Sequence, residues 1–315
     1  GVMAVLAVWL LVLSSFAAWI QNRALAGKRY TTISGKGFIP RLVELRGWRL
    51  ASLTVCLSYV LVTVVAPIAI LVAAALSTYT WSGKYSVDHM ISMLSTDDVW
   101  ETLKISVGLS VISATASTLI GLFIAWIVTR TRLLGKKFLE FLVILPISIP
   151  GIAFGVAVLL VWLHVPFPVY GTVFVIIAAF VGRFTAYAVR STSASLVQIH
   201  PELEECARVG GYGRLQTFIR ITLPLIAPSI VAAWLLLFSF FMTELSMVVI
   251  LYAADSRTFS VLAFEAWNNG DFSRLAAYSL LQMGVGIVFM IFFKMILLRR
   301  RFGSGEGARP QPDFA

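Results

Sequence analysis

The chain has 315 residues, of which 59% are hydrophobic and only 13% charged, and its mean hydropathy is +0.90. A soluble domain carries roughly 25% charged residues, so this composition argues against a cytosolic enzyme and indicates an all-α polytopic membrane protein. The net charge of +10 would suggest nucleic acid as the partner of a soluble protein, but in a membrane protein it records which loops are cytoplasmic.

Seven apolar stretches are long enough to cross about 30 Å of hydrocarbon as helices. They are residues 2–20, 51–76, 103–128, 139–162, 172–190, 225–252 and 275–298. Only Gly1 precedes the first stretch, and no basic residue stands before the apolar run, which is unlike a signal peptide. We therefore expect residue 1 to be an internal cut in a longer polypeptide.

Nineteen of the 25 Lys and Arg residues fall in four segments outside the spans. These segments are 21–50, 129–138, 190–224 and the tail after 298. Because cytoplasmic loops collect Lys and Arg, we predict that all four are cytoplasmic, the C-terminus included. The polar, glycine-containing linker 21–50 then separates two parts: 1–20, the last transmembrane helix of a preceding half, and a six-helix unit at 51–298 followed by a tail at 299–315.

Small residues recur every four positions along span 103–128, in two lines. One line is Ser106, Ser110, Ala114 and Thr118, and the other is Ser113, Ser117, Gly121 and Ala125. Such stripes let helices approach closely in lipid. They indicate either packing inside the bundle or a face toward a partner subunit or the transport path.

Span 139–162 is interrupted by Pro146 and Pro150, which Gly151 follows. Each proline removes a backbone donor and kinks the helix, so the sequence is consistent with a plain kink or with a gate on a pathway. Arg183 and Glu244 are predicted to lie within spans, where an ionisable group is expensive. Each either reaches an interface or polar neighbour or lines the translocation pathway.

The cytoplasmic segment 191–224 is too polar to span and is patterned like two short helices. Pro201 suits a first helical turn, and acidic residues follow it at the positive end of the helix dipole. Gly210 and Gly211 can stop that helix, and a second amphipathic stretch leads to Pro224 and the next span. We interpret this element as a docking surface.

The same segment resembles the EAA loop of type I ABC importer permeases, in which Glu-Ala-Ala, three residues, Gly and nine residues precede Ile-x-Leu-Pro. Here the residues are Glu205-Cys206-Ala207, Gly211 and Ile221-Thr222-Leu223-Pro224, and only Cys206 departs from the pattern. The resemblance covers 51–298 and implies the MetI-like six-helix fold. The coupling residues that it implies are Glu204, Glu205, Cys206, Ala207, Arg208, Gly211, Ile221, Leu223 and Pro224.

This resemblance implies a permease in the bacterial inner membrane that works by alternating access. Its expected partners are a dimer of cytoplasmic ABC ATPase subunits, which would bind ATP and Mg, a periplasmic substrate-binding protein, and a second six-helix half. The chain itself is expected to have no catalytic, cofactor or metal site. No Gly-Lys pair is followed by Ser or Thr, so a P-loop is absent, and His89, His164 and His200 are isolated in three loops.

Three segments further resemble fused iron(III) permeases, which carry two six-helix halves in one polypeptide. They are residues 29–38, 202–205 and 269–272. Iron(III) is the expected substrate, and 2-aminoethylphosphonate, thiamine and polyamines remain alternatives. A secondary transporter driven by an ion gradient is the alternative from another class, but it would favour inverted repeats and several buried acids, of which Glu244 alone is present.

Overall fold

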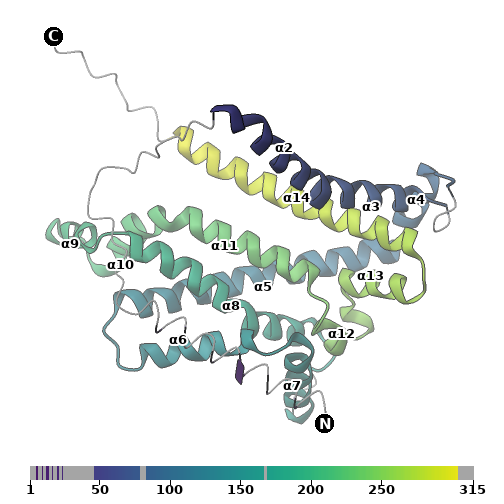
Figure 1. Cartoon of the computed structure of the whole chain (residues 1–315). Coiled ribbons are helices and arrows are strands. Elements are labelled where there is room, and N and C mark those ends of the chain that lie inside the picture. Colours follow the sequence, from purple (N-terminus) through teal and green to yellow (C-terminus); the bar gives the residue numbers. More distant parts are fainter. Residues whose placement is uncertain are drawn as a thin grey trace. The chain divides into compact units, whose positions relative to one another are not determined.

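The computed structural model describes residues 46–78, 83–166 and 169–303, with side chains as far as Met295, and a few positions between Val5 and Arg23. The described chain is helical, and its single β feature is an antiparallel bridge between Ser77 and Tyr85 (Figure 1). The predicted all-α class is therefore confirmed. The predicted span 2–20 lies outside the described residues apart from single positions.

Internal contacts divide the chain into two units. Unit 1 includes residues 102–261 and the segment from Gln282 onward, and unit 2 includes residues 12–101 and 262–281. The helices of unit 1 begin with α5 (Asp97–Arg130), whose first five residues belong to unit 2. The others are α6 (Lys136–Ile144), α7 (Gly151–His164), α8 (Val173–Gln198), α9 (Pro201–Val209), α10 (Arg214–Thr217), α11 (Leu223–Thr243) and α12 (Val248–Leu251), with the short turns η3 (Leu145–Ser148), η4 (Phe218–Thr222) and η5 (Ala254–Ser256). Unit 2 holds η1 (Arg46–Trp48), α2 (Arg49–Val60), η2 (Leu61–Val65), α3 (Ala66–Leu76) and α4 (Val87–Leu94), while α13 (Phe259–Asn268) and α14 (Phe272–Gly303) run from one unit into the other.

Five helical stretches of the described chain are long and apolar enough to cross a membrane. They are Arg49–Leu76, Asp97–Arg130, Val173–Gln198, Arg214–Thr243 and Phe272–Met295. A bent pair, Lys136–Ser148 and Gly151–His164, can provide a sixth crossing. These elements correspond to the six predicted spans between residues 51 and 298.

The stretch predicted as one kinked span at 139–162 is instead two helices that meet at 109°. Pro150 has no N–H to donate, and the residue before a proline is pushed out of the helical region. Accordingly Ile149 (ψ 132°) and Pro150 (ψ 139°) are both extended, and α7 starts only at Gly151. The structure therefore has two separate helices here, and the prediction of a single kinked helix was wrong.

The predicted span 225–252 is also interrupted, since α11 ends at Thr243. Glu244 has an extended backbone (ψ 116°), and its side-chain Oε1 accepts a hydrogen bond from the Met247 backbone N–H at 3.3 Å. A carboxylate that bonds to nearby backbone competes with the helical ladder. The continuous helix predicted through this point was wrong.

Helix α8 is the core of unit 1 and packs against α11, α6 and α7. Half of its apolar span is buried, more than in the other four spans. Phe180 stacks on Phe241 of α11 with ring centroids 4.6 Å apart. On α5, the two small-residue stripes are buried, and a Cβ added at Gly121 would collide with Ala188 of α8. The stripes therefore pack inside the bundle, the first of the two predicted alternatives.

Unit 2 has a small core of its own. Ala75 of α3 and Met93 of α4 are buried with Ala276 and Ala277 of α14. By contrast, no residue of the most apolar window of Arg49–Leu76 is buried inside the described chain. Such a helix needs an apolar solvent around it, as a bilayer provides.

Candidate functional site

The docking element predicted from the sequence begins with α9. Pro201 occupies the first turn of α9, with Glu202 and Glu204 beside it. The helix ends where Gly211 adopts φ +87°, a left-handed conformation that favours glycine. The Tyr212 N–H then donates back to the Ala207 carbonyl at 3.1 Å. The structure thus has the helix and the glycine stop in the predicted places.

A second helical stretch follows directly and runs into the membrane span. The Gly213 backbone N–H donates to Gln216 Oε1 at 3.1 Å, and the Thr217 hydroxyl donates to the Gly213 carbonyl at 3.1 Å. The five residues of η4 form a π-helical turn that leads into α11. Pro224 lies in the first turn of α11, close to Ile221 and Leu223 in the sequence, so the Ile-x-Leu-Pro phrase forms this junction.

Glu204 faces inward and ties α9 to the rest of unit 1. Its Oε1 lies 3.0 Å from Arg130 Nε and accepts a hydrogen bond from the Thr222 hydroxyl at 3.1 Å. Arg130 Nη2 also donates to the carbonyls of Leu196 at 2.9 Å and Ile199 at 3.0 Å. The Arg130 and Glu204 side chains are only 13% and 19% exposed. One arginine therefore joins the end of α5, the end of α8 and the first turn of α9.

The other predicted coupling residues of α9 differ in their exposure. Glu205, Cys206 and Arg208 are exposed, whereas Ala207 is buried. Two apolar side chains that the sequence reasoning did not single out share the exposed surface, Leu203 and Val209. Their apolar character in a short polar helix was the available signal. The predicted coupling residues thus divide into an outward group and an inward group.

The proline break at 146–151 meets Arg183 of α8. Arg183 Nη2 donates to the Ile149 carbonyl at 3.0 Å, which satisfies an acceptor that the helix break leaves free. A Cβ added at Gly151 would lie 2.6 Å from Arg183 Nη1 and 2.7 Å from Ser246 Cβ. The structure therefore brings Gly151 and Arg183 together, and it adds Ser246, which the sequence reasoning missed.

The break after α11 lies next to the same region. A Cβ on Gly155 would lie 3.1 Å from Met247, so α7 packs closely against the turn between α11 and α12. The Glu244 carbonyl accepts a hydrogen bond from the Ser260 hydroxyl at 2.9 Å. Pro146 lies within η3, and its carbonyl accepts from the Ile149 N–H at 3.2 Å. Both chain breaks are therefore held by specific polar contacts.

Comparison with known families decides what this helical bundle is. The family described as binding-protein-dependent transport system inner membrane component matches residues 117–302, from the second half of α5 to the end of α14. The chain belongs to this family. It is a membrane permease of the binding-protein-dependent ABC importers, and the matched region contains both the α9 element and the two helix breaks.

Similar proteins include permeases with different named substrates. The permease is 28% identical over 298 residues to the ferric transport system permease protein FbpB of Actinobacillus pleuropneumoniae, covering 92% of this chain and 42% of the relative. It is 24% identical over 242 residues to a Salmonella paratyphi A permease, PhnV, whose name gives 2-aminoethylphosphonate transport, covering 76% of this chain and 90% of that relative. The permease thus spans less than half the length of the ferric relative.

The fold is also that of a solved transporter. A bacterial alginate ABC transporter, in complex with an alginate pentasaccharide-bound periplasmic protein, aligns with a TM-score of 0.64 and 19% identity. The alignment covers 78% of this permease and 93% of the matched chain. At this identity the likeness establishes the shared fold.

Proposed function

We propose that this permease couples ATP hydrolysis by a separate ATPase subunit to import from the periplasm, and that the outer face of α9 is the ATPase docking surface. The observation that carries the proposal is the division of α9 into two faces. Glu204 anchors the helix through Arg130 and Thr222, and this leaves Glu205 and Cys206 exposed on the other side of α9, while Arg208 is exposed next to Glu204. A rigidly held helix can transmit a push into α5, α8 and α11, whereas a loose one cannot.

The pathway proposed for the substrate passes the junction of the two helix breaks. Gly151, Arg183 and Ser246 meet there, and Glu244 lies two residues from Ser246. Broken helices form the binding sites of many transporters, because unwound backbone presents polar groups at membrane depth. Alternating access would then move these helices relative to a second six-helix half, with substrate supplied by a periplasmic binding protein.

Iron(III) is the substrate that we propose. The ferric relative supports it, since the similarity to it extends over 92% of this chain and beyond the family region. 2-Aminoethylphosphonate is the second candidate, supported by the relative named for it. Uptake of radioactive iron and of labelled 2-aminoethylphosphonate, measured in cells with and without the intact transporter, separates the two substrates.

The docking surface can be tested through a thiol that the chain already carries. Cys206 and Cys56 are both exposed and are not paired with each other, so a Cys56→Ser variant leaves Cys206 as the single thiol of these 315 residues. In inverted membrane vesicles, a membrane-impermeant maleimide should label Cys206, and the bound ATPase subunit should block that labelling. Cys206→Ser in the same background gives the zero level. Labelling that is equally fast with and without the ATPase would refute the docking assignment.

Energy dependence discriminates between this proposal and a secondary transporter. Uptake into vesicles that contain the assembled transporter should require ATP on the α9 side and should persist when ionophores collapse the ion gradients. Uptake that follows the ion gradient and ignores ATP would favour the secondary transporter.

A further inference from the structure

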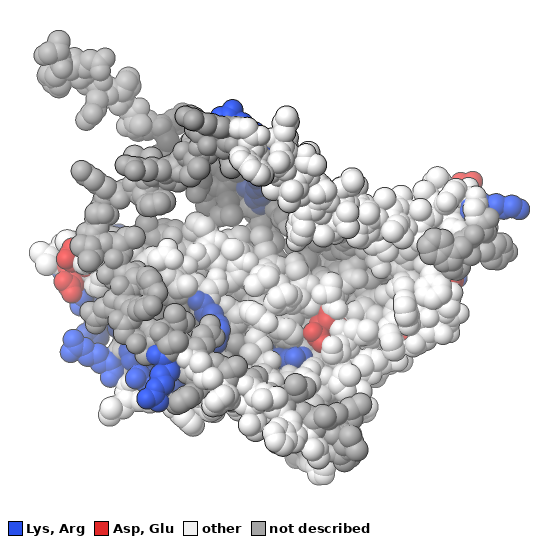
Figure 2. Space-filling model, viewed as in Figure 1, with Lys and Arg blue, Asp and Glu red and all other residues white. Residues whose placement is uncertain are grey.

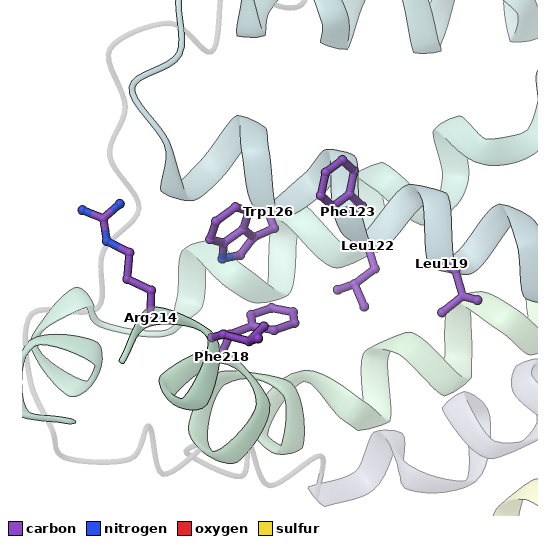
Figure 3. Close-up of a pocket in the computed structure, with 7 residues that line it drawn as sticks. Leu119, Leu122, Phe123, Trp126, Arg214 and Phe218 are labelled. Atoms are coloured by element: carbon purple, nitrogen blue, oxygen red, sulfur yellow. The ribbon is translucent and has the colours of Figure 1, made fainter. Parts of the chain in front are cut away.

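A groove with apolar walls opens beside the second helical stretch of the docking element. Four residues of α5 form one wall, and three residues of α10 and η4 form the other. They are Leu119, Leu122, Phe123 and Trp126, and Arg214, Leu215 and Phe218 (Figure 3). The groove has a volume of about 330 Å³ and belongs entirely to unit 1.

The walls of this groove are exposed although they are apolar. Leu119 is 61% exposed, Phe123 63% and Leu215 70%. Exposed apolar surface of this kind marks a contact with another molecule or with lipid. Because the groove lies along a membrane-spanning helix, the surrounding medium is hydrocarbon for most of its length.

The groove has one apolar end and one cationic end. From Leu119 to Trp126 the wall runs about 10 Å along α5, at 1.5 Å per residue. Arg214 lies at the Trp126 end, and its guanidinium points away from the rings (Figure 3). The Trp126 and Phe218 rings meet edge to face there, with centroids 6.1 Å apart. Tryptophan is typical of the membrane–water boundary, and α5 ends four residues later at Arg130.

We infer that this groove binds an anionic phospholipid, with one acyl chain along Leu119–Trp126 and the headgroup phosphate at Arg214. Three observations favour this occupant. The apolar-to-cationic order matches a lipid set along the helix axis. None of the residues that line the groove is acidic, so the guanidinium is available to a phosphate, to which arginine binds with two parallel hydrogen bonds. Trp126 lies at the cationic end of the groove, and tryptophan is typical of the membrane–water boundary, where a headgroup lies.

This inference goes beyond the proposed coupling and needs only the family assignment. The proposed orientation of the permease places this groove in the cytoplasmic leaflet of the membrane, so that part of the inference rests on the proposed function. A bound headgroup would contact the helix stretch that connects α9 to α11. The lipid composition of that leaflet would therefore act on the docking element.

Lipid retention by the purified transporter, with all its subunits, tests the site. The complex is equilibrated with mixed micelles of phosphatidylglycerol and phosphatidylcholine in detergent, and the retained lipid is quantified by mass spectrometry. We expect wild type to retain phosphatidylglycerol preferentially. Arg214→Gln should reduce that preference about fivefold, the effect of one cation near a lipid surface. Arg132→Gln removes an exposed arginine outside the groove and should leave the preference unchanged.

A fluorescence measurement covers the case in which Arg214→Gln disturbs assembly. Phosphatidylglycerol with brominated acyl chains should quench wild-type tryptophan fluorescence more than brominated phosphatidylcholine does. Trp126→Phe should abolish that difference. Equal retention by Arg214→Gln and Arg132→Gln, equal quenching by the two lipids, or full displacement of the lipid by water-soluble glycerol phosphate would each overturn the assignment.

Discussion

Two adjacent carboxylates on α9 have different surroundings, and this difference is the main residue-scale result. Neighbouring helical positions point about 100° apart, so Glu204 and Glu205 cannot share one face. Glu204 is 19% exposed and is held by Arg130 and Thr222, whereas Glu205 is exposed. Their substitution should therefore disturb different properties of the permease.

Glu204→Ala should loosen α9. It leaves the mostly buried Arg130 guanidinium without its carboxylate, and a hydrogen bond to a charged group contributes about 1.5–3 kcal/mol. Hydrogen exchange should therefore speed up at the backbone N–H groups of Gly210, Gly211 and Tyr212, which end α9. The matched control is Glu140→Ala on α6, whose carboxylate is exposed outside α9 and whose removal should leave the exchange of α9 at the wild-type rate. Unchanged exchange in Glu204→Ala would contradict the anchoring role.

Glu205→Ala should have the opposite profile. The side chain is exposed, so its removal should leave the exchange of α9 and the amount of protein in the membrane at the wild-type level. Uptake driven by ATP should nevertheless fall, because the carboxylate belongs to the proposed docking surface. The measurement compares substrate uptake per unit of ATP hydrolysed in Glu205→Ala, in Glu140→Ala on α6 and in wild type. Wild-type coupling in Glu205→Ala would remove this residue from the docking surface.

At the scale of elements, the break between η3 and α7 depends on a glycine. A Cβ at Gly151 would lie 2.6 Å from Arg183 Nη1 and 2.7 Å from Ser246 Cβ, inside van der Waals contact. Gly151→Ala should therefore displace the Arg183 guanidinium, push α7 away from Ser246 between α11 and α12, and destabilise the permease by about 1–3 kcal/mol, the usual effect of overpacking. Reversible unfolding in detergent measures the change. Gly182→Ala on α8 is the control, because its Cβ would lie 3.8 Å from Phe154, an ordinary van der Waals contact. If Gly182→Ala destabilised the permease as much as Gly151→Ala does, the packing argument would be contradicted.

The sequence predicted the elements well and their interruptions less well. Apolar length located the spans between residues 51 and 298, and Pro201 with Gly211 located the ends of α9, because these signals are local. The 109° bend was underestimated as a kink, since a proline specifies a lost donor but its neighbours specify the angle. The inward direction of Glu204 depends on Arg130, 74 residues earlier, and no local pattern contains that information.

At the scale of the whole molecule, charge asymmetry predicts how the permease is oriented in the membrane. Helix α5 is 34 residues long, or about 50 Å at 1.5 Å per residue, so it spans a bilayer with both ends outside the hydrocarbon. It begins with Asp97 and Asp98 and ends with Arg130. Figure 2 shows Lys and Arg side chains gathered where α9, α10 and the turn before α6 lie. Because cytoplasmic segments retain Lys and Arg, this end is expected to face the cytoplasm.

Thiol labelling from one side of the membrane tests this orientation. In a Cys56→Ser background, Cys206 on α9 should react with an impermeant maleimide in inverted vesicles. It should not react in cells in which only the outer membrane has been permeabilised. Asn269 is exposed in the turn between α13 and α14, and the basic C-terminal turn of α14 is at the other end of that helix. In a Cys56→Ser, Cys206→Ser background, Asn269→Cys should therefore react in the permeabilised cells. Since Arg214–Thr243 is the one candidate span of the described chain between Cys206 and Asn269, the two thiols should respond to opposite sides. If Cys206 reacts in the permeabilised cells and Asn269→Cys reacts only in inverted vesicles, the orientation is reversed, and α9 cannot meet a cytoplasmic ATPase.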